Sequence, residues 1–261
     1  MGWITRFADH GVHVYGMEFG RYLIAAGSVS LALWLAAPWA AQRRIQDRIA
    51  GWSDRRREFV NSMITVVVFA LNGMAVLALS EAGVFHVSRA MPVWWLGLAE
   101  FAGMVIAHDA YFYWMHRGLH SRAMFRRAHL EHHRSIAPTP WAAYSFAPIE
   151  SFFEAFYIPL FLLFVPMHAI IVLAFLLHQI FRNVLGHMGH ELAWPGFTRS
   201  RWTGWLTTTT HHDLHHSQGR YNFGLYFTWW DRMMGTEHPR YHDAFETAAQ
   251  PWFRGRKDAV A

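Results

Sequence analysis

Residues 59–80 read FVNSMITVVVFALNGMAVLALS, a stretch without a single charged side chain. A helix needs about 20 predominantly apolar residues to cross the roughly 30 Å hydrocarbon core of a bilayer. Across the chain 53% of residues are hydrophobic and only 16% are charged, whereas average soluble proteins are about 25% charged. The 14 Trp and 21 Phe fit aromatic side chains at lipid interfaces. The sequence therefore predicts an all-α integral membrane protein.

Three further apolar regions flank this one. RYLIAAGSVSLALWLAAPWAA at 21–41 and VWWLGLAEFAGMVIAHDAYFYWM at 93–115 are each long enough for one crossing. Residues 152–185 are too many for one crossing, because a single helix of that length would extend about 50 Å. Pro159 and Pro166 offer break points there. We therefore expect about four transmembrane segments, the last of them a hairpin.

The arginines predict the orientation of these segments, because cytoplasmic loops of membrane proteins are enriched in Lys and Arg. Six arginines lie between the first two spans, and the expected crossings return two later basic segments to the same side. The three groups are Arg43, Arg44, Arg48, Arg55, Arg56 and Arg57; Arg117, Arg122, Arg126, Arg127 and Arg134; and Arg199, Arg201 and Arg220. We expect a helical cap on the cytoplasmic side, in a bacterial inner membrane.

Neither an internal repeat nor a linker divides the chain. We expect one membrane-embedded domain over 1–261, with N-terminal spans at 1–92, a catalytic core at 93–240 and a tail at 241–261. The formal charge of +5 comes from arginines beside apolar runs, which membrane topology explains. No nucleic-acid partner is expected.

The chain has no cysteine and 19 histidines, so a metal site here must use nitrogen and oxygen ligands. HRGLH, HLEHH and HHDLHH space their histidines three or four residues apart, which places them on one helix face. Those histidines are His116 and His120; His129, His132 and His133; and His212, His215 and His216, with His211 directly before the last cluster. Eight imidazoles exceed the four ligands of a tetrahedral zinc, so the sequence predicts two metal ions. The second histidine of a zinc-protease motif is missing, since Trp194 stands in its place after His190.

The segments around these clusters resemble the fatty acid hydroxylase/sterol desaturase superfamily of integral-membrane oxygenases. The resemblance covers about 108–239 and rests on HDAYFYWMHRGLH, EHHRSIAPTPWAAYSFAPIE and HHDLHHSQGRYNFGLYFTWWDRMMGTEHP. It implies a di-iron centre, held mainly by histidines, that activates O2 and attacks an unactivated lipid C–H bond; zinc is expected as a substitute in purified protein. The implied ligands are the eight histidines of the clusters and His187. Further candidates, as ligands or as residues supporting them, are His190, His211, Asp109, Asp213 and Asn222, and more weakly Glu131 and Asp231.

The expected activity is therefore that of a monooxygenase that hydroxylates, or desaturates, a lipid. The chain shows neither a dinucleotide fingerprint nor a haem domain, so its electrons would come from a separate ferredoxin or cytochrome b5-like donor. A transition-metal transporter and a zinc-dependent lipid hydrolase are the alternatives. A sterol, a hopanoid, a fatty acyl chain, a carotenoid and an aminolipid fit the sequence alike.

Overall fold

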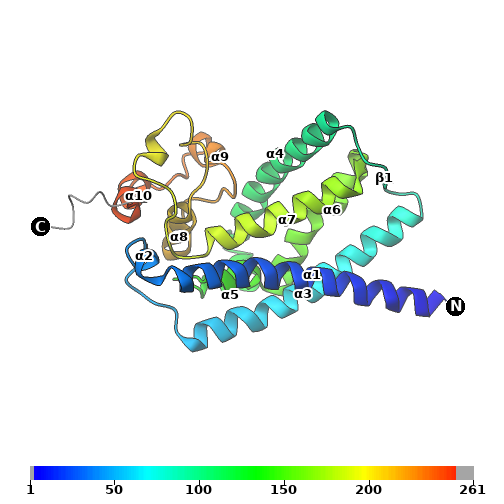
Figure 1. The fold of residues 1–261 in the computed structure, drawn as a ribbon, viewed down its shortest axis with the longest axis horizontal. Coiled ribbons are helices and arrows are strands. Elements are labelled where there is room, and N and C mark those ends of the chain that lie inside the picture. The colour runs from blue at the N-terminus through cyan, green and yellow to red at the C-terminus, as the bar shows by residue number, and fades with distance from the viewer. Residues whose placement is uncertain (1–2, 251–261) are drawn as a thin grey trace, which may run out of the picture.

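Long apolar helices run through the molecule, and short helices gather at one of its ends (Figure 1). The structure, a computed structural model, describes residues 3–250. Its long helices are α1 (Trp3–Leu35), α3 (Trp52–Glu81), α4 (Trp94–Leu119), α6 (Pro148–Phe164) and α7 (Ala169–Gly186). The short helices are α2 (Ala37–Ala41), the π-helix η1 (Phe125–His129), α5 (Leu130–His133), the 3-10 helices η2 (Pro140–Tyr144) and η3 (Phe197–Arg199), α8 (Thr209–Gln218), α9 (Trp229–Met233) and α10 (Tyr241–Ala248). The expectation of a mainly helical fold is confirmed.

Two of the helices, α3 and α7, are long and apolar enough to cross a membrane. Only 28% of the apolar window of α3 and 22% of that of α7 are buried inside the protein. Most of their apolar side chains therefore face outwards, which suits a lipid environment and not a soluble core. The first predicted span differs from the structure, because α1 begins at Trp3 and ends at Leu35. Pro38 explains that end: proline cannot continue a helix, and it stands in the first turn of α2 instead.

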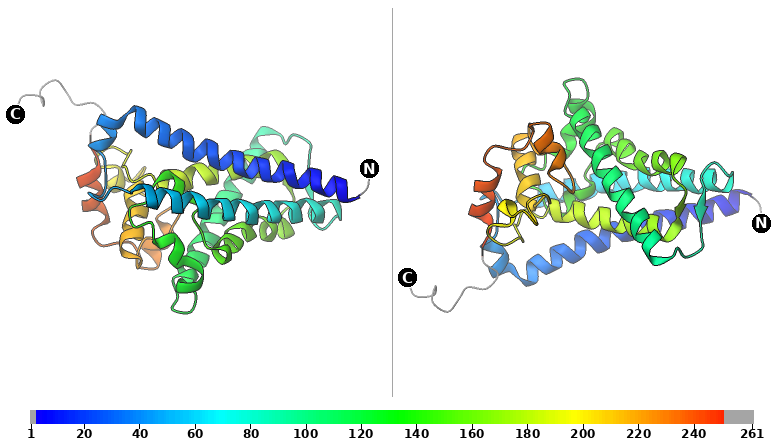
Figure 2. Two further views of the ribbon diagram at one scale, coloured as in Figure 1. Left: turned by 90° about the horizontal axis from the view of Figure 1, so that it is seen from below. Right: turned by 90° about the horizontal axis from the view of Figure 1, so that it is seen from above.

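The region at 152–185 is a hairpin of α6 and α7, and its break lies at Pro166. The expected break at Pro159 is wrong, since Pro159 lies inside α6. Helices among other apolar helices tolerate an internal proline. At the turn, β2 (Met167–His168) pairs in parallel with β1 (Val87–Ser88) from the link between α3 and α4. This clasp lies near the N-terminal end of α1, whereas α2, α8 and α10 lie at the opposite end (Figures 1 and 2).

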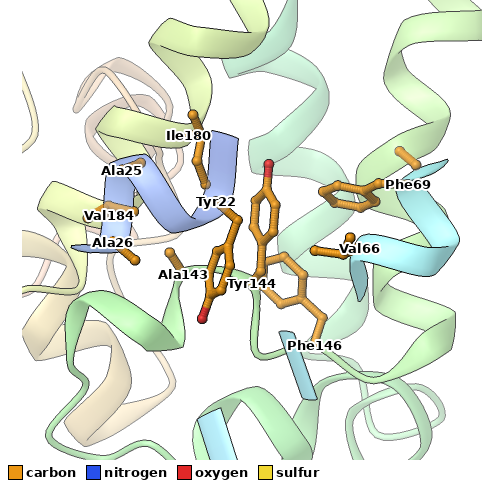
Figure 3. Packing of buried hydrophobic residues seen from close by; sticks show 11 residues of the cluster. Tyr22, Ala25, Ala26, Val66, Phe69, Ala143, Tyr144, Phe146, Ile180 and Val184 are labelled. Carbon is orange, nitrogen blue, oxygen red and sulfur yellow. The ribbon is translucent and has the colours of Figure 1, made fainter. Parts of the chain in front are cut away.

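An aromatic cluster joins the long helices to η2, the short helix that follows the second histidine motif in the chain (Figure 3). Tyr22 of α1 stacks on Tyr144 of η2 with ring centroids 5.3 Å apart, and its hydroxyl donates to the carbonyl of Trp141 at 2.9 Å. Phe69 of α3 meets the same Tyr144 ring edge-on at 4.9 Å. Helices α1 and α3 approach closely at Gly73, where an added Cβ would lie only 2.9 Å from Val14 Cγ1. The packing thus fixes η2 against the long helices.

Candidate metal centre

The histidine motifs lie on three helical segments: the end of a long helix and two short helices. The first occupies the last turn of α4. The second follows the change from the π-helix η1 to α5 at His129. The third lies on α8, which begins after Thr208, whose side chain accepts from the backbone N–H of His211, and ends at Gly219 with φ of +65°. Each motif is therefore held on a helix with defined ends.

Nine imidazoles gather in two groups at this end of the molecule. The group of five consists of His116, His120, His129, His133 and His215, and the group of four consists of His132, His187, His212 and His216. Within each group the potential ligand atoms all lie within 4.8 Å of one another. These nine are the residues that the sequence and the family resemblance singled out as ligands.

Helix geometry decides which group each imidazole joins. Residues four apart share a helix face, and the pairs His116/His120, His129/His133 and His212/His216 each stay within one group. Adjacent residues point about 100° apart, so His132 and His133 belong to different groups. The repeated His-His pairs thus let one short helix serve both groups.

The Nε2 atoms point at one another over short distances. In the group of five, His133 Nε2 lies 3.1 Å from that of His120 and 3.0 Å from that of His215. In the group of four, His187 Nε2 lies 3.0 Å from that of His212 and 3.1 Å from that of His216. Such convergence of imidazole nitrogens is the arrangement a transition-metal ion requires.

The hydrogen bonds made by Nδ1 determine whether each Nε2 carries a hydrogen or a free lone pair. Nδ1 lies 2.7 Å from the Asn183 carbonyl in His187, 2.7 Å from the Tyr221 carbonyl in His215 and 3.0 Å from the Phe223 carbonyl in His116. A carbonyl only accepts, so Nδ1 carries the hydrogen and Nε2 keeps its lone pair. Lone pairs about 3 Å apart repel unless a cation lies between them. The donor set therefore fits metal ions and does not fit a hydrogen-bonded histidine cluster.

Burial keeps these imidazoles neutral. It lowers the pKa of His133 to about 3, with neighbouring imidazoles adding to the shift. Burial also holds the pKa of His132, His215 and His216 well below the usual value for histidine. Neutral imidazole is the form that binds metal, so these side chains are ready ligands at neutral pH.

Glu150 is a supporting residue that the sequence reasoning missed. Its carboxylate Oε1 accepts a hydrogen bond from Nδ1 of His129 at 2.8 Å, and both side chains are almost fully buried. A carboxylate behind an imidazole orients a metal ligand and raises its basicity. The available signal was its position at the end of the APIE segment, inside the stretch that resembles the oxygenase family.

The other candidate residues lie outside both groups, and most of them hold the loop after α8. His211 Nε2 lies 3.3 Å from Asp231 Oδ2, and Asp231 accepts the backbone N–H groups of Phe223 and Gly224 at 2.9 and 2.8 Å. Asn222 adopts a left-handed φ of +59° and donates to the His211 carbonyl at 2.9 Å. This network positions the carbonyl of Phe223 that accepts from His116.

The remaining candidates have separate contacts. Asp109 Oδ1 accepts the backbone N–H groups of Tyr226 and Phe227, and Asp213 accepts from the side-chain amide of Gln46 at 2.8 Å. The Nδ1 atom of His190 lies 2.7 Å from the backbone carbonyl oxygen of Met188. Glu131 pairs with Arg134 and Asn61. Within residues 3–250 neither histidine group includes an aspartate or a glutamate.

The comparison with protein families matches residues 101–236, just over half the chain, to the fatty acid hydroxylase model. Human lathosterol oxidase is 31% identical over 144 residues, covering 54% of this chain and 46% of its own. The Gibberella zeae Delta(7)-sterol 5(6)-desaturase ERG3B is 32% identical over 54% of this chain and 42% of its own. Rat methylsterol monooxygenase 1 is 30% identical over 58% of this chain and 50% of its own. The chain thus spans about half the length of these relatives. No solved structure matches it significantly.

Proposed function

Because the chain belongs to the fatty acid hydroxylase family, we propose that it is a membrane-bound di-iron oxygenase that oxidises a lipid C–H bond. Hydroxylation would consume O2, two electrons and two protons, placing one oxygen atom in the lipid and the other in water. Desaturation would consume the same reagents. The two hydrogens removed from the lipid to form the double bond would leave with both oxygen atoms as two molecules of water. The enzyme would be an oxidoreductase in either case.

The observation that carries this proposal is the pair of buried imidazole groups. In three of these imidazoles Nδ1 is hydrogen-bonded to a backbone carbonyl, which leaves Nε2 free to bind a metal. We assign one metal ion to the group of five histidines and one to the group of four. Imidazole ligands suit iron, copper, nickel and zinc, and the family membership favours iron. When bound, the iron pair would supply the activation of O2.

The chain's own residues would orient and shield that centre. Glu150 and the backbone carbonyls hold the imidazole rings in one tautomer. His116, His129 and His187 are about 1–2% exposed, so the protein excludes bulk water from the ligand side. Exclusion of water strengthens electrostatic interactions in the site and suppresses side reactions.

We also propose a membrane orientation and a type of redox partner, based on the end of the molecule that carries the metal groups. We place the metal groups on the cytoplasmic side, in a bacterial inner membrane. Exposed arginines at this end, among them Arg44, Arg48 and Arg126, suit an acidic electron donor such as a ferredoxin or a cytochrome b5-like protein. The names of the three relatives all refer to sterols, which makes a sterol-class lipid the first substrate to test.

The decisive experiment supplies iron-loaded protein in lipid nanodiscs with a reduced ferredoxin, a sterol and 18O2. Hydroxylation predicts one labelled oxygen in the product, and desaturation predicts loss of two hydrogens with labelled water. Product formation in the absence of O2 would instead indicate a hydrolase. Metal uptake into vesicles without lipid oxidation would indicate a transporter.

A further inference from the structure

A cavity of about 120 Å³ lies among the long helices and is lined by side chains from α1, α3, α4, η2, α6 and α7. Its wall is largely apolar, with Val76, Tyr157 and Phe175 among the lining residues. The volume accommodates the end of a lipid and not a whole one. Lining residues such as Glu18, Asn72 and Leu176 are only half-buried, so the cavity reaches the outer surface of the bundle beside them.

Polar groups without partners face into this apolar cavity. Glu154 is 9% exposed and lines the cavity, and it makes no hydrogen bond or ion pair with any residue in the described part of the chain. The Tyr144 hydroxyl is buried and has no partner either. In Figure 3 the Tyr144 ring lies between the side chains of Tyr22 and Phe69, and its hydroxyl points away from Phe146. A buried polar group without a partner costs about 1–3 kcal/mol.

Arg21 adds unsatisfied donors to the same cavity. Its Nη2 pairs with Glu18, one turn earlier on α1, but Nε and Nη1 are buried and lack acceptors among the described residues. The cavity therefore offers donors from Arg21 and Tyr144 and an acceptor from Glu154. An ammonium only donates, so it would leave the Arg21 and Tyr144 donors unpaired, and a carboxylate only accepts, so it would leave Glu154 unpaired. A neutral hydroxyl can donate to Glu154 and accept from Arg21 or Tyr144 at once.

We propose that this cavity binds the free hydroxyl end of a lipid alcohol, through Glu154, Tyr144 and Arg21. This inference rests on the proposed oxygenase function, for which it names the substrate class and a specificity site. Glu154 lies one helical turn, about 6 Å, from Glu150 on the same face of α6, and Glu150 contacts His129. His108, another lining residue, lies two turns, about 12 Å, before His116 on α4. The anchored hydroxyl would therefore lie one to two helical turns from residues of the metal centre along both α4 and α6.

The test measures binding and not turnover. Full-length, metal-loaded protein in nanodiscs is titrated with cholesterol and with cholesteryl methyl ether, and separately with hexadecan-1-ol and hexadecyl methyl ether. The ether cannot donate, so at least one alcohol should bind about tenfold more tightly than its ether. The pair that shows the preference identifies a rigid or a flexible lipid body. Equal affinity within both pairs would overturn the proposal.

Variants assign the preference to the cavity. Tyr144→Phe and Glu154→Leu should each reduce the alcohol preference to about threefold or less, whereas Glu154→Gln, which keeps an accepting oxygen, should retain most of it. Tyr15→Phe removes a hydroxyl from an exposed ring on α1 and should leave the preference unchanged. A full preference in both Tyr144→Phe and Glu154→Leu would overturn the assignment. Because affinity needs neither O2 nor electrons, selective binding by an inactive protein would contradict only the oxygenase proposal. Active protein that binds alcohol and ether equally would contradict only this one.

Discussion

Two neighbouring histidines on α8 belong to different metal-binding groups, which leads to a prediction for single-residue changes. His215 belongs to the group of five and His216 to the group of four. Each single change to Ala should therefore lower metal content from about two ions per chain to about one, and the double change should remove both. Metal per chain after purification without chelators provides the measurement.

The matched control for these variants is His86→Ala. His86 is exposed beside β1, at the end of the molecule opposite the metal groups, so its removal should leave metal content unchanged. Two ions retained by both His215→Ala and His216→Ala would contradict the assignment of these two imidazoles as required ligands.

The lowered pKa of the buried imidazoles predicts unusual acid tolerance of metal binding. A free imidazole takes up a proton near pH 6.5 and loses its metal. Burial lowers the pKa of His133 to about 3, so its lone pair stays available far below that pH. Metal content should remain constant from about pH 7.5 to about pH 5.5 and fall only as the pH nears the lowered pKa. Dialysis at graded pH with metal analysis checks this, and half-loss near pH 6.5 would contradict it.

At the scale of the element, the loop after α8 depends on one buried carboxylate. Asp231 accepts from Phe223 N, Gly224 N and the Thr236 hydroxyl at 2.8–2.9 Å. Asp231→Ala leaves these donors unpaired and frees the carbonyl that orients His116. The free energy of unfolding should fall by about 2–5 kcal/mol, and metal should be lost from the group of five first. Thermal unfolding in detergent and metal analysis measure the two effects.

Asp243→Ala controls for the loss of a carboxylate as such. Asp243 is exposed and pairs with Arg199 on the surface, and such pairs contribute little to stability. Its melting temperature should match that of the unchanged protein. Equal melting temperatures for Asp231→Ala and the unchanged protein would show that the loop does not depend on Asp231.

The sequence predicted those features that depend on residues close together in the chain, and it did not predict those that depend on contacts between distant segments. Apolar runs indicated the long helices, and four-residue spacing indicated which imidazoles share a face. The pairing of His120 with His215 across 95 positions and the support of His129 by Glu150 depend on tertiary packing, which spacing does not encode. Pro159 was misjudged because neighbouring helices offset the loss of its backbone hydrogen bond.

For the whole molecule, the arrangement of the two ends predicts a labelling pattern. Ser53 and Ser217 are exposed at the metal end, and Ser88 is exposed in the clasp at the other. The chain has no cysteine, so single Ser→Cys changes report without background. In intact bacterial cells an impermeant maleimide should label Ser88→Cys and spare the other two until the membrane is opened. Labelling of only one of Ser53→Cys and Ser217→Cys in intact cells would contradict the prediction that both positions lie on the same side of the membrane.

The distribution of the nine imidazoles along the chain also sets the point at which the centre can assemble during synthesis. Four members of the group of five precede residue 134, but only His132 of the group of four does. Neither group is complete until α8 emerges from the ribosome and docks, because α8 supplies His215 to one group and His212 and His216 to the other. A translation product that stops before Thr209 should therefore carry neither ion. Binding of both ions thus reports that the chain has been made and folded as far as α8.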